Sequence, residues 1–304
     1  MSKVTIYQQA CKQVTGFKAM GEHFMRNLVI NGRSKSTHEN YLRQMAKLAL
    51  HCKKSPLELE PVELEEYLYD LMQEGKTTSS LSEFKHLVYG LRKLYLLNGL
   101  DSKHIVLPSI AHSKALPVVL SQGEVKRLLI TPKHLWERVF YAMAYDTGMR
   151  ISELVHVCIN DVDLQRKQVH IRQSKFKKDR YVAISEHLAR GIQKHLTLNK
   201  PKDYLFNHPE RKGIPLSKTG IRIRLKETLK QAGIQKKVCM HTFRHTFATH
   251  QLEAGNNIVS VKEAMGHALL SATLVYLNIA RLTASNITGC LDNLYTAKAI
   301  SGKR

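Results

Sequence analysis

The sequence predicts a mainly α-helical protein with a small β-hairpin, divided into two domains. Residues from about 16 to 100 show the apolar spacing of helices throughout, and a segment rich in proline and serine follows at 101–118. The second half combines helical segments with one pair of short alternating strands, as in an α+β domain. A chain of 304 residues, 43% of them hydrophobic, is long enough to give each of two domains its own core.

Three helices are predicted in the first domain. Ser36 and Thr37 can cap a helix that runs on from Tyr41. Pro61, followed by acidic residues, suits the first turn of a second helix, in both its geometry and its charge. A third helix, beginning near residue 80 or 82, repeats its apolar residues at the spacing of one buried face, through Phe84, Leu87, Val88, Leu91, Leu94 and Tyr95.

The segment 101–118 is predicted to be an extended connector. It sets the domain boundary near residue 112, so that the domains comprise 1–112, with a linker from about 101, and 113–304. Ser121 and Glu124 have the spacing of a capping box for the helix that follows. Strands are expected in 168–173 and 180–185, joined by the turn SKFKKD, and helices over 136–146, 152–157, 217–232, 242–254, 258–266 and 270–280.

The charge balance indicates the class of partner. Lysine and arginine number 47 against 25 aspartate and glutamate residues, which gives a formal net charge of +22. Both halves are basic, so nucleic acid is the leading partner, because phosphate contacts release counterions. A basic protein of another kind, such as a ribosome-associated one, is the alternative. The five cysteines form no CxxC pair, and neither a signal peptide nor a membrane span is recognisable, which favours a cytoplasmic protein without membrane partners.

Four short segments carry residue types suited to chemistry on phosphate. A glycine break places an arginine at the start of a helix in TGMRISEL, and the hairpin turn crowds four cations together. In HTFRH, two histidines and an arginine share one helical face. The segment MGH is followed, nine residues after its histidine, by a tyrosine. The segments lie at 147–154, 174–180, 241–245 and 265–276.

Together these segments resemble the tyrosine recombinases, also called phage integrases, a family that includes the Xer recombinases and Cre. The resemblance covers about 115–285, where the TGxRxSEL, HxxRH and [LM]GH boxes occur in order before the tyrosine. The helical first half, with Thr37 and Tyr41 on one helix, is similar to the family's SAM-like core-binding domain, although less specifically. The resemblance implies a two-domain, C-shaped clamp on DNA with a tyrosine recombinase catalytic domain.

The resemblance also implies a catalytic set, and the chemistry suits these residue types. Tyr276 is the expected nucleophile and forms a 3′-phosphotyrosine. Its phenol has an ordinary pKa near ~10, so it needs a base to lose its proton. Two guanidinium groups can hold the non-bridging oxygens of the phosphate. An ammonium group can protonate the leaving 5′-oxygen. No metal ion, ATP or other cofactor is implied. The expected residues are Arg150 and Arg244 on the phosphate, His241 as base, Lys175 as general acid, and His267 as hydrogen-bond donor, with His245 orienting or packing its neighbours.

The sequence departs from the family pattern in two places. The hairpin turn lacks the family's two glycines, so either Lys175 or Lys177 can be the general acid. After the tyrosine, Leu277 and Asn278 replace the family's frequent Thr-His pair. The chain also has no room for the arm-binding domain of some phage integrases. The predicted DNA-binding residues are Thr37, Arg43, Lys85, Arg92, Lys177 and Lys178.

Three alternatives stay open at this point. His241 and His245 have the spacing of a zinc pair on a helix, but Thr242 stands where HExxH has its glutamate. A DNA-binding protein without catalysis is the second alternative. A type IB topoisomerase, which shares the chemistry but relaxes supercoils without partner strands, is the third.

The expected partner is double-stranded DNA carrying an inverted-repeat core site. One such site is expected to take a dimer, and two paired sites a tetramer. The tail after about residue 283 is expected to dock on a neighbouring copy. A second recombinase or a directionality factor is a further possible partner. Neither the target sequence nor the direction of recombination follows from these residues.

Overall fold

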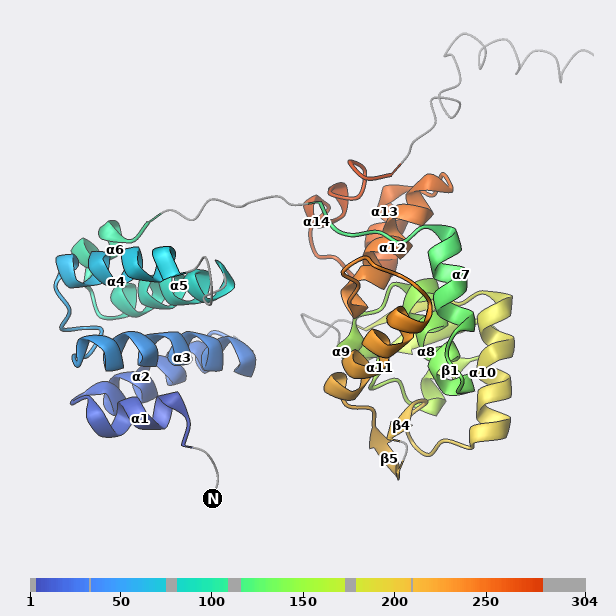
Figure 1. Ribbon diagram of the computed structural model, residues 1–304, viewed down its shortest axis with the longest axis horizontal. Coiled ribbons are helices and arrows are strands. Elements are labelled where there is room, and N and C mark those ends of the chain that lie inside the picture. Colours follow the sequence, from blue (N-terminus) through green and yellow to red (C-terminus); the bar gives the residue numbers. More distant parts are fainter. Residues whose placement is uncertain are drawn as a thin grey trace, which may run out of the picture. The chain divides into compact units, whose positions relative to one another are not determined.

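The structure is a computed structural model that describes residues 4–32, 34–74, 81–108, 116–172, 179–208 and 210–280. The chain divides into two compact units, Met1–Ser113 and Lys114–Arg304. Figure 1 colours the first unit blue to cyan and the second green to red. Within the described residues, no helix has the length and apolar character needed to cross a membrane.

The first unit is helical. Its core forms where α3 packs against α1 and α5. The apolar face predicted for the third helix is confirmed, because all six of its residues are buried. Pro61 is the first residue of α4, also as predicted. The helices are α1 (Ile6–Gln13), α2 (Phe17–Ile30), α3 (Lys35–Cys52), α4 (Pro61–Glu74), α5 (Leu81–Leu97) and α6 (Asp101–Val106).

Two predictions for the first unit are corrected. The helix α3 begins at Lys35 with Ser34 at its N-cap, earlier than the predicted cap at Ser36 and Thr37. Residues 101–106 form the helix α6 rather than the start of an extended connector. Lys103 fixes this helix by donating to the carbonyl groups of Leu57 and Leu59 at 3.1 and 2.6 Å. The composition of 101–118 gives no information on these long-range contacts.

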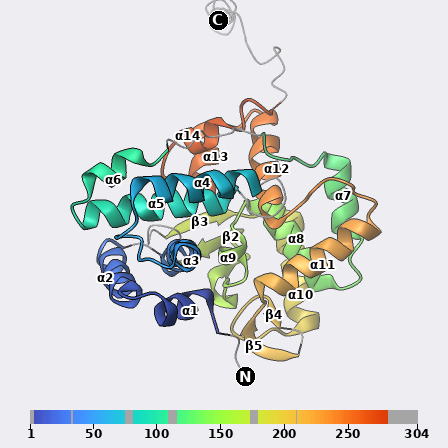
Figure 2. The same cartoon turned by 60° about the vertical axis from the view of Figure 1, so that its left-hand side comes forward.

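The second unit mixes helices with two small antiparallel sheets. The predicted hairpin is confirmed: β2 pairs with β3 in the register Val169↔Val182 (Figure 2). The strand β1 pairs with β2 and adds a third strand to this sheet. The capping box of Ser121 and Glu124 is also confirmed. The elements are α7 (Gln122–Ile130), α8 (Leu135–Thr147), α9 (Ile151–Leu154), the 3₁₀ helix Ile159–Asp161, β1 (Val162–Asp163), β2 (Gln168–Ile171), β3 (Arg180–Ala183), α10 (Glu186–Asn199), β4 (Asn207–His208), β5 (Arg211–Pro215), α11 (Lys218–Gln231), α12 (Met240–Glu253), α13 (Ile258–Met265) and α14 (Ser271–Leu274).

The prediction was incomplete or wrong at two places in this unit. The helix α10 and the β4–β5 pair were not predicted. The helix expected over 270–280 is only the short α14, after which the chain continues in turns through Tyr276. Most backbone hydrogen bonds there join residues three apart, as from the Tyr276 N–H to the Thr273 carbonyl at 3.0 Å.

Two hydrophobic clusters build the second unit and meet along α12. The main core gathers around α8, which packs against α7, α10 and α12. It includes Met240 and Phe243 at the start of α12. A separate satellite core takes the later residues of α12, with members from α13 and the tyrosine segment: Phe247, Ala248, Leu252, Val261, Met265 and Tyr276. Arg244 therefore lies on α12 at the junction of the two cores.

Candidate active site

The glycine break after α8 positions Arg150. The helix ends at Thr147, and Gly148 adopts a left-handed conformation with φ of 60°. An added Cβ at Gly148 would lie 2.4 Å from the Phe247 ring, so only glycine fits the turn. Arg150 follows as the N-cap of α9. Its backbone N–H and its Nη1 donate to the two carboxylate oxygens of Glu153, each at 2.9 Å.

Arg244 is a buried cation held by backbone carbonyl groups. Its side chain is 1% exposed. Nη1 donates to the Gly148 carbonyl and Nη2 to the Met265 carbonyl, both at 2.6 Å. Within the described part of the chain, no carboxylate pairs with this guanidinium, and its buried Nε has no hydrogen-bond partner. Burial and the nearby Arg150 lower the pKa of Arg244 to about 10, so the group is still cationic at neutral pH.

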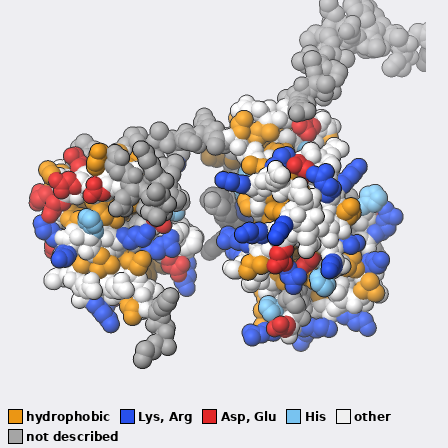
Figure 3. Space-filling model, viewed as in Figure 1, with side chains coloured by type: hydrophobic (Ala, Val, Ile, Leu, Met, Phe, Trp, Pro, Cys, Tyr) orange, Lys and Arg blue, Asp and Glu red, His pale blue; other side chains and the backbone are white. Residues whose placement is uncertain are grey.

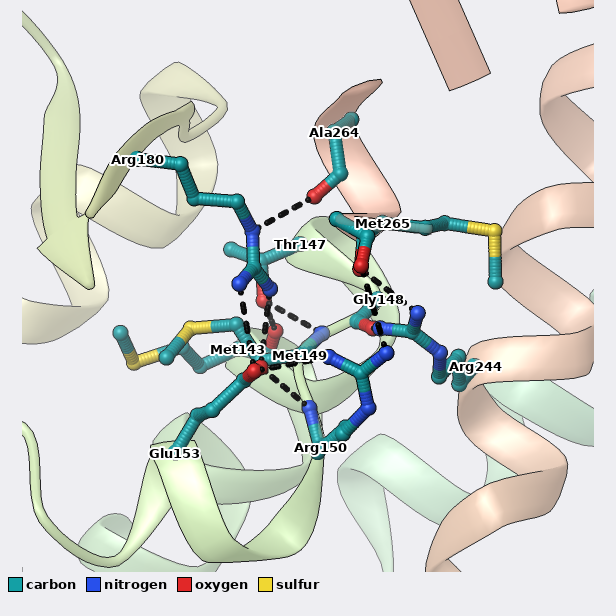
Figure 4. Close-up of polar contacts among 11 residues, drawn as sticks. Met143, Thr147, Gly148, Met149, Arg150, Glu153, Arg180, Arg244, Ala264 and Met265 are labelled. Carbon is teal, nitrogen blue, oxygen red and sulfur yellow. Dashed lines mark hydrogen bonds and ion pairs between the residues drawn. The ribbon is translucent and has the colours of Figure 1, made fainter. Parts of the chain in front are cut away.

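The two arginines converge on one turn of the chain. Arg150 donates from Nη2 to the Gly266 carbonyl at 3.4 Å, next to the Met265 carbonyl that Arg244 contacts. Figure 4 shows both guanidinium groups reaching this α13–α14 turn from different elements. The structure thus brings together two fork-shaped donors that are distant in sequence, beside the histidine at position 267.

Tyr276 lies against the histidines with its hydroxyl engaged. Its side chain is 4% exposed and belongs to the satellite core. The hydroxyl lies 3.0 Å from Nδ1 of His245. The ring stacks on that of His267, with centroids 6.5 Å apart and planes 12° apart. Burial raises the pKa of Tyr276, and the guanidinium groups of Arg244 and Arg150 partly oppose this.

The three histidines are neutral in the free protein at neutral pH. Burial, then His241 and Arg244, lower the pKa of His245 to about 4. Burial, then Arg244 and Arg150, lower the pKa of His267 to about 4 and also depress that of His241. The rings of His241 and His245 meet edge to face, with centroids 4.6 Å apart. His267 Nδ1 lies 2.9 Å from the Thr273 hydroxyl.

The structure places His245, rather than His241, at the tyrosine hydroxyl. No hydrogen bond joins His241 to Tyr276 among the described residues. The helical spacing of HTFRH puts both histidines on one face but does not say which of them reaches a tyrosine thirty residues later. That choice depends on the turn after α13. Among the described residues, no group of three or more His, Cys, Asp and Glu side chains is arranged to hold a metal ion.

Two charged residues of the site received no role from the sequence. Glu153 accepts from Arg150 and also from Arg180, and its side chain is 7% exposed. Burial raises the pKa of Glu153, but hydrogen bonds and charge from Arg180 and Arg150 outweigh it, so the net pKa is lowered. Glu153 and Arg180 lie inside the motif segments 147–154 and 174–180. The spacing of three residues between Arg150 and Glu153 was the signal from which their pairing could have been predicted.

The predicted DNA-contact residues have different surroundings. Arg43 is exposed on α3 and donates to the Asn40 side chain at 3.0 Å. The Thr37 hydroxyl lies 2.9 Å from that of Ser34. Lys85 on α5 is half-buried. Arg92, also on α5, donates to the Pro108 carbonyl at 2.5 Å and so holds the segment after α6. Lys175, Lys177 and Lys178 lie outside the described residues.

Charged side chains are unevenly distributed on the two units. On the face of the second unit seen in Figure 3, lysine and arginine are much more frequent than acidic side chains. In the first unit, the acidic residues of α4 include the exposed Glu65, Glu66 and Asp70. The helix α4 is therefore unsuited to face phosphate, whereas the exposed Arg43 on α3 is suited to it.

Comparisons with known proteins find matches to both units of the chain. The phage integrase family matches residues 118–282, and the phage integrase N-terminal SAM-like domain matches residues 21–97. The tyrosine recombinase XerA of Pyrococcus horikoshii is 30% identical over 283 residues, or 92% of this chain and 95% of the relative. A crystal structure of XerA recombinase aligns with a TM-score of 0.51 at 27% identity, over 95% of this chain and 99% of that one.

A more distant structure shows the same fold. A lambda integrase dimer bound to a COC′ core site aligns with a TM-score of 0.68 at 17% identity, over 84% of this chain and 96% of that one. The matches to the phage integrase family and to the tyrosine recombinase XerA define the class, an enzyme that cleaves and rejoins DNA. The chain belongs to the phage integrase family, the tyrosine recombinases.

Proposed function

We propose that the protein is a site-specific DNA recombinase that cleaves and rejoins duplex DNA through a 3′-phosphotyrosine at Tyr276. One observation carries the proposal: the Arg150 and Arg244 guanidinium groups converge on the turn that carries His267, and the Tyr276 ring stacks on that histidine. A site with three guanidinium groups, counting Arg180, and one carboxylate has excess positive charge. A phosphodiester supplies the missing negative charge.

The arginines stabilise the charge that develops on the phosphate. Attack by the phenolic oxygen places additional negative charge on the two non-bridging oxygens. Arg150 and Arg244 meet this charge with planar, bidentate donors. Arg244 is prepared for this role because its Nε has no partner within the described chain. Its other nitrogens are already oriented by carbonyl groups, so little reorganisation accompanies the reaction.

The proton transfers fall to the histidines and the hairpin lysine. Tyr276 loses its proton on attack, and His241 is the proposed base, with His245 as the group that holds the hydroxyl in the free protein. His267 donates to the phosphate. Lys175 protonates the leaving 5′-oxygen, with Lys177 as the alternative donor. Since the bond energy is kept in the phosphotyrosine, a 5′-hydroxyl can reverse the step, and neither ATP nor a metal ion takes part.

The free protein holds Tyr276 away from a substrate. With the side chain 4% exposed and the hydroxyl engaged by His245, attack requires the segment after α14 to move. DNA binding is proposed to supply the free energy for this movement. The two units would close on duplex DNA as a C-shaped clamp, with Thr37, Arg43, Lys85 and Arg92 from the first unit and Lys177 and Lys178 from the second contacting the backbone.

The assembly is proposed to follow the symmetry of the DNA. Two protomers bind one inverted-repeat core site, and two such sites pair in a tetramer. The segment 284–304, which lies outside the described residues, is proposed to dock on a neighbouring copy. Deleting it should therefore impair the pairing of sites more than binding to one site. Full recombination by the shortened chain would contradict tail docking.

The reaction class is tested by trapping the covalent intermediate. A duplex containing the site selected by the wild-type chain from a randomised inverted-repeat library is nicked beside the cleavage position, so that the leaving fragment diffuses away. A covalent adduct should accumulate equally with and without EDTA. Binding without an adduct would indicate a non-catalytic DNA-binding protein, and loss of the adduct in EDTA would contradict the proposed chemistry. Relaxation of plasmids lacking the site would instead favour a topoisomerase.

A further inference from the structure

Arg180 connects three parts of the site although it lies at the edge of the sheet. It is the first residue of β3, and its side chain is 11% exposed. Nη1 and Nη2 donate to the two carboxylate oxygens of Glu153, at 3.1 and 2.8 Å. Nε donates to the Ala264 carbonyl at 3.2 Å, at the end of α13. Figure 4 shows Arg180 between these two groups.

The guanidinium also lies against the turn after α13. Gly266 has a φ of +63°, and a Cβ built on it would lie 2.9 Å from Nη1 and 3.0 Å from Cζ of Arg180. The turn therefore has no space for a side chain because the arginine occupies it. The carbonyl of this same glycine accepts from Arg150, and His267 is the next residue.

We propose that Arg180 is a positioning residue for the cleavage reaction, which fixes Glu153, and through it Arg150, to the turn that carries His267. The inference rests on the proposed function. Arg180 is not assigned a contact with DNA. Its role is to set the distance between the Arg150 guanidinium and the His267 imidazole, which approach the phosphate from two different elements.

The geometry requires an arginine rather than any cation. Three nitrogens of one planar group donate in three directions, two to the carboxylate and one to a carbonyl. A lysine keeps the charge, but its single ammonium on a flexible chain cannot reproduce the bidentate contact and the Ala264 contact together. The Arg180→Lys variant therefore separates the loss of geometry from the loss of charge.

The matched control is another arginine paired with a buried carboxylate in the same unit. Arg224 on α11 lies 3.1 Å from Glu137, whose side chain is 6% exposed against 7% for Glu153. Neither residue of this pair contacts the proposed catalytic residues in the described structure. The variant Arg224→Ala thus removes an arginine from a buried carboxylate, as Arg180→Ala does, but at a distance from the chemistry.

The experiment measures single-turnover adduct formation by the full-length chain on the nicked duplex described above, at saturating protein. Arg180→Ala should lower the rate about 10²-fold, the cost expected for displacing a catalytic group by about 1 Å. Arg180→Lys should recover only a small part of this rate. DNA affinity should change by no more than a few-fold in either variant, and Arg224→Ala should keep the wild-type rate even if its melting temperature falls.

A pH profile distinguishes positioning from simple destabilisation. The charged groups around Glu153 are Arg180, Arg150 and, further away, Arg244. Without Arg180 the pKa of Glu153 rises, so the loss of rate on acidification should begin at higher pH in Arg180→Ala than in wild type. The double variant Arg180→Ala, Glu153→Gln should lose this difference, because it has no carboxyl group to titrate.

The outcomes are distinguishable from failure of the proposed function. If the wild-type chain forms no adduct, the recombinase proposal itself fails. If wild type is active but Arg180→Lys matches its rate, positioning by the planar group is wrong. It is also wrong if Arg180→Ala and Arg224→Ala lose rate in proportion to their loss of melting temperature, with unshifted pH profiles.

Discussion

The two hydrophobic cores of the second unit hold different residues of the proposed reaction. The main core surrounds α8, and the chain leaving α8 carries Arg150. The satellite core is small, is built from the end of α12, α13 and the tyrosine segment, and contains Tyr276 itself. Arg244 stands where the two cores meet. Arg150 is thus attached to the larger core, Arg244 to both cores, and the proposed nucleophile to the smaller core.

In the proposed mechanism, this difference lets one domain hold the arginines in place while it keeps the tyrosine buried. A large, closely packed core holds guanidinium groups in place before the reaction, so little free energy is spent on reorganising them when it occurs. A small cluster at the edge of a domain opens at a lower free-energy cost. Since Tyr276 is buried in the free protein, its proposed release would be a local opening of the satellite core.

The largest expected effect comes from changing Arg244. Arg244→Lys keeps the charge but loses the fork that contacts the Gly148 and Met265 carbonyls and is proposed to contact the phosphate. The rate of adduct formation should fall roughly 10²–10³-fold, while DNA binding at the same salt concentration changes little. Single-turnover kinetics and a binding titration measure the two effects. A lysine variant with the wild-type rate would show that position 244 needs only charge.

The next effect compares the two cores directly. Leu128 is in the main core and Leu252 in the satellite core, and both are buried. Each Leu→Ala change should cost about 2–5 kcal/mol in the free energy of unfolding, with Leu128→Ala at the upper end because its surroundings cannot collapse into the cavity. Urea unfolding measures this cost.

Only Leu252→Ala should increase hydrogen exchange in the residues after α14. Equal increases in both variants would mean that the satellite core does not open separately from the main core.

The contact between the cores gives a smaller effect. Gly148→Ala adds both the strain of a left-handed alanine, about 1–2 kcal/mol, and a clash with the Phe247 ring at 2.4 Å. Gly233 has a similar φ of 66° but nothing within 4 Å of an added Cβ. Gly233→Ala therefore measures the strain alone. The excess cost of Gly148→Ala over Gly233→Ala in urea unfolding, about 1–3 kcal/mol, reports the packing between the cores.

The last effect is a pH dependence of stability. His245 and His267 have folded pKa values of about 4, below the ordinary 6.5. The unfolded chain therefore binds more protons between these pH values, and the folded state loses stability as pH falls from 6.5 towards 4. Above pH 6.5 the two histidines contribute no dependence. Melting temperatures of wild type and His245→Gln should converge on acidification, whereas a constant gap would contradict the depressed pKa.

Motifs with local periodicity predicted their part of the structure well. The buried face of α5, the glycine break after α8 and the β2–β3 pairing follow from spacing over a few residues. The helix α6 could not be predicted from local spacing, because Lys103 holds it through carbonyl groups more than forty residues away. Local pattern gives no information on such contacts.

The site shows the same limit. The motifs placed Arg150, Arg244, His267 and Tyr276 in order, and the structure brings them together. The partner of the tyrosine hydroxyl was not predictable, because it depends on the path of the chain between α13 and Tyr276. The contact of Arg180 with Glu153 was equally unpredictable, since a basic hairpin segment gives no indication that its one arginine contacts a buried glutamate.

The most direct test identifies the residue that carries the DNA. The covalent adduct is digested with protease and nuclease, and mass spectrometry locates the phosphate. The account predicts a phosphate on Tyr276, joined to the 3′ side of the break, and no adduct from Tyr276→Phe although this variant still binds the site. A phosphate on another residue, attachment to the 5′ side, or an undiminished adduct from Tyr276→Phe would contradict it.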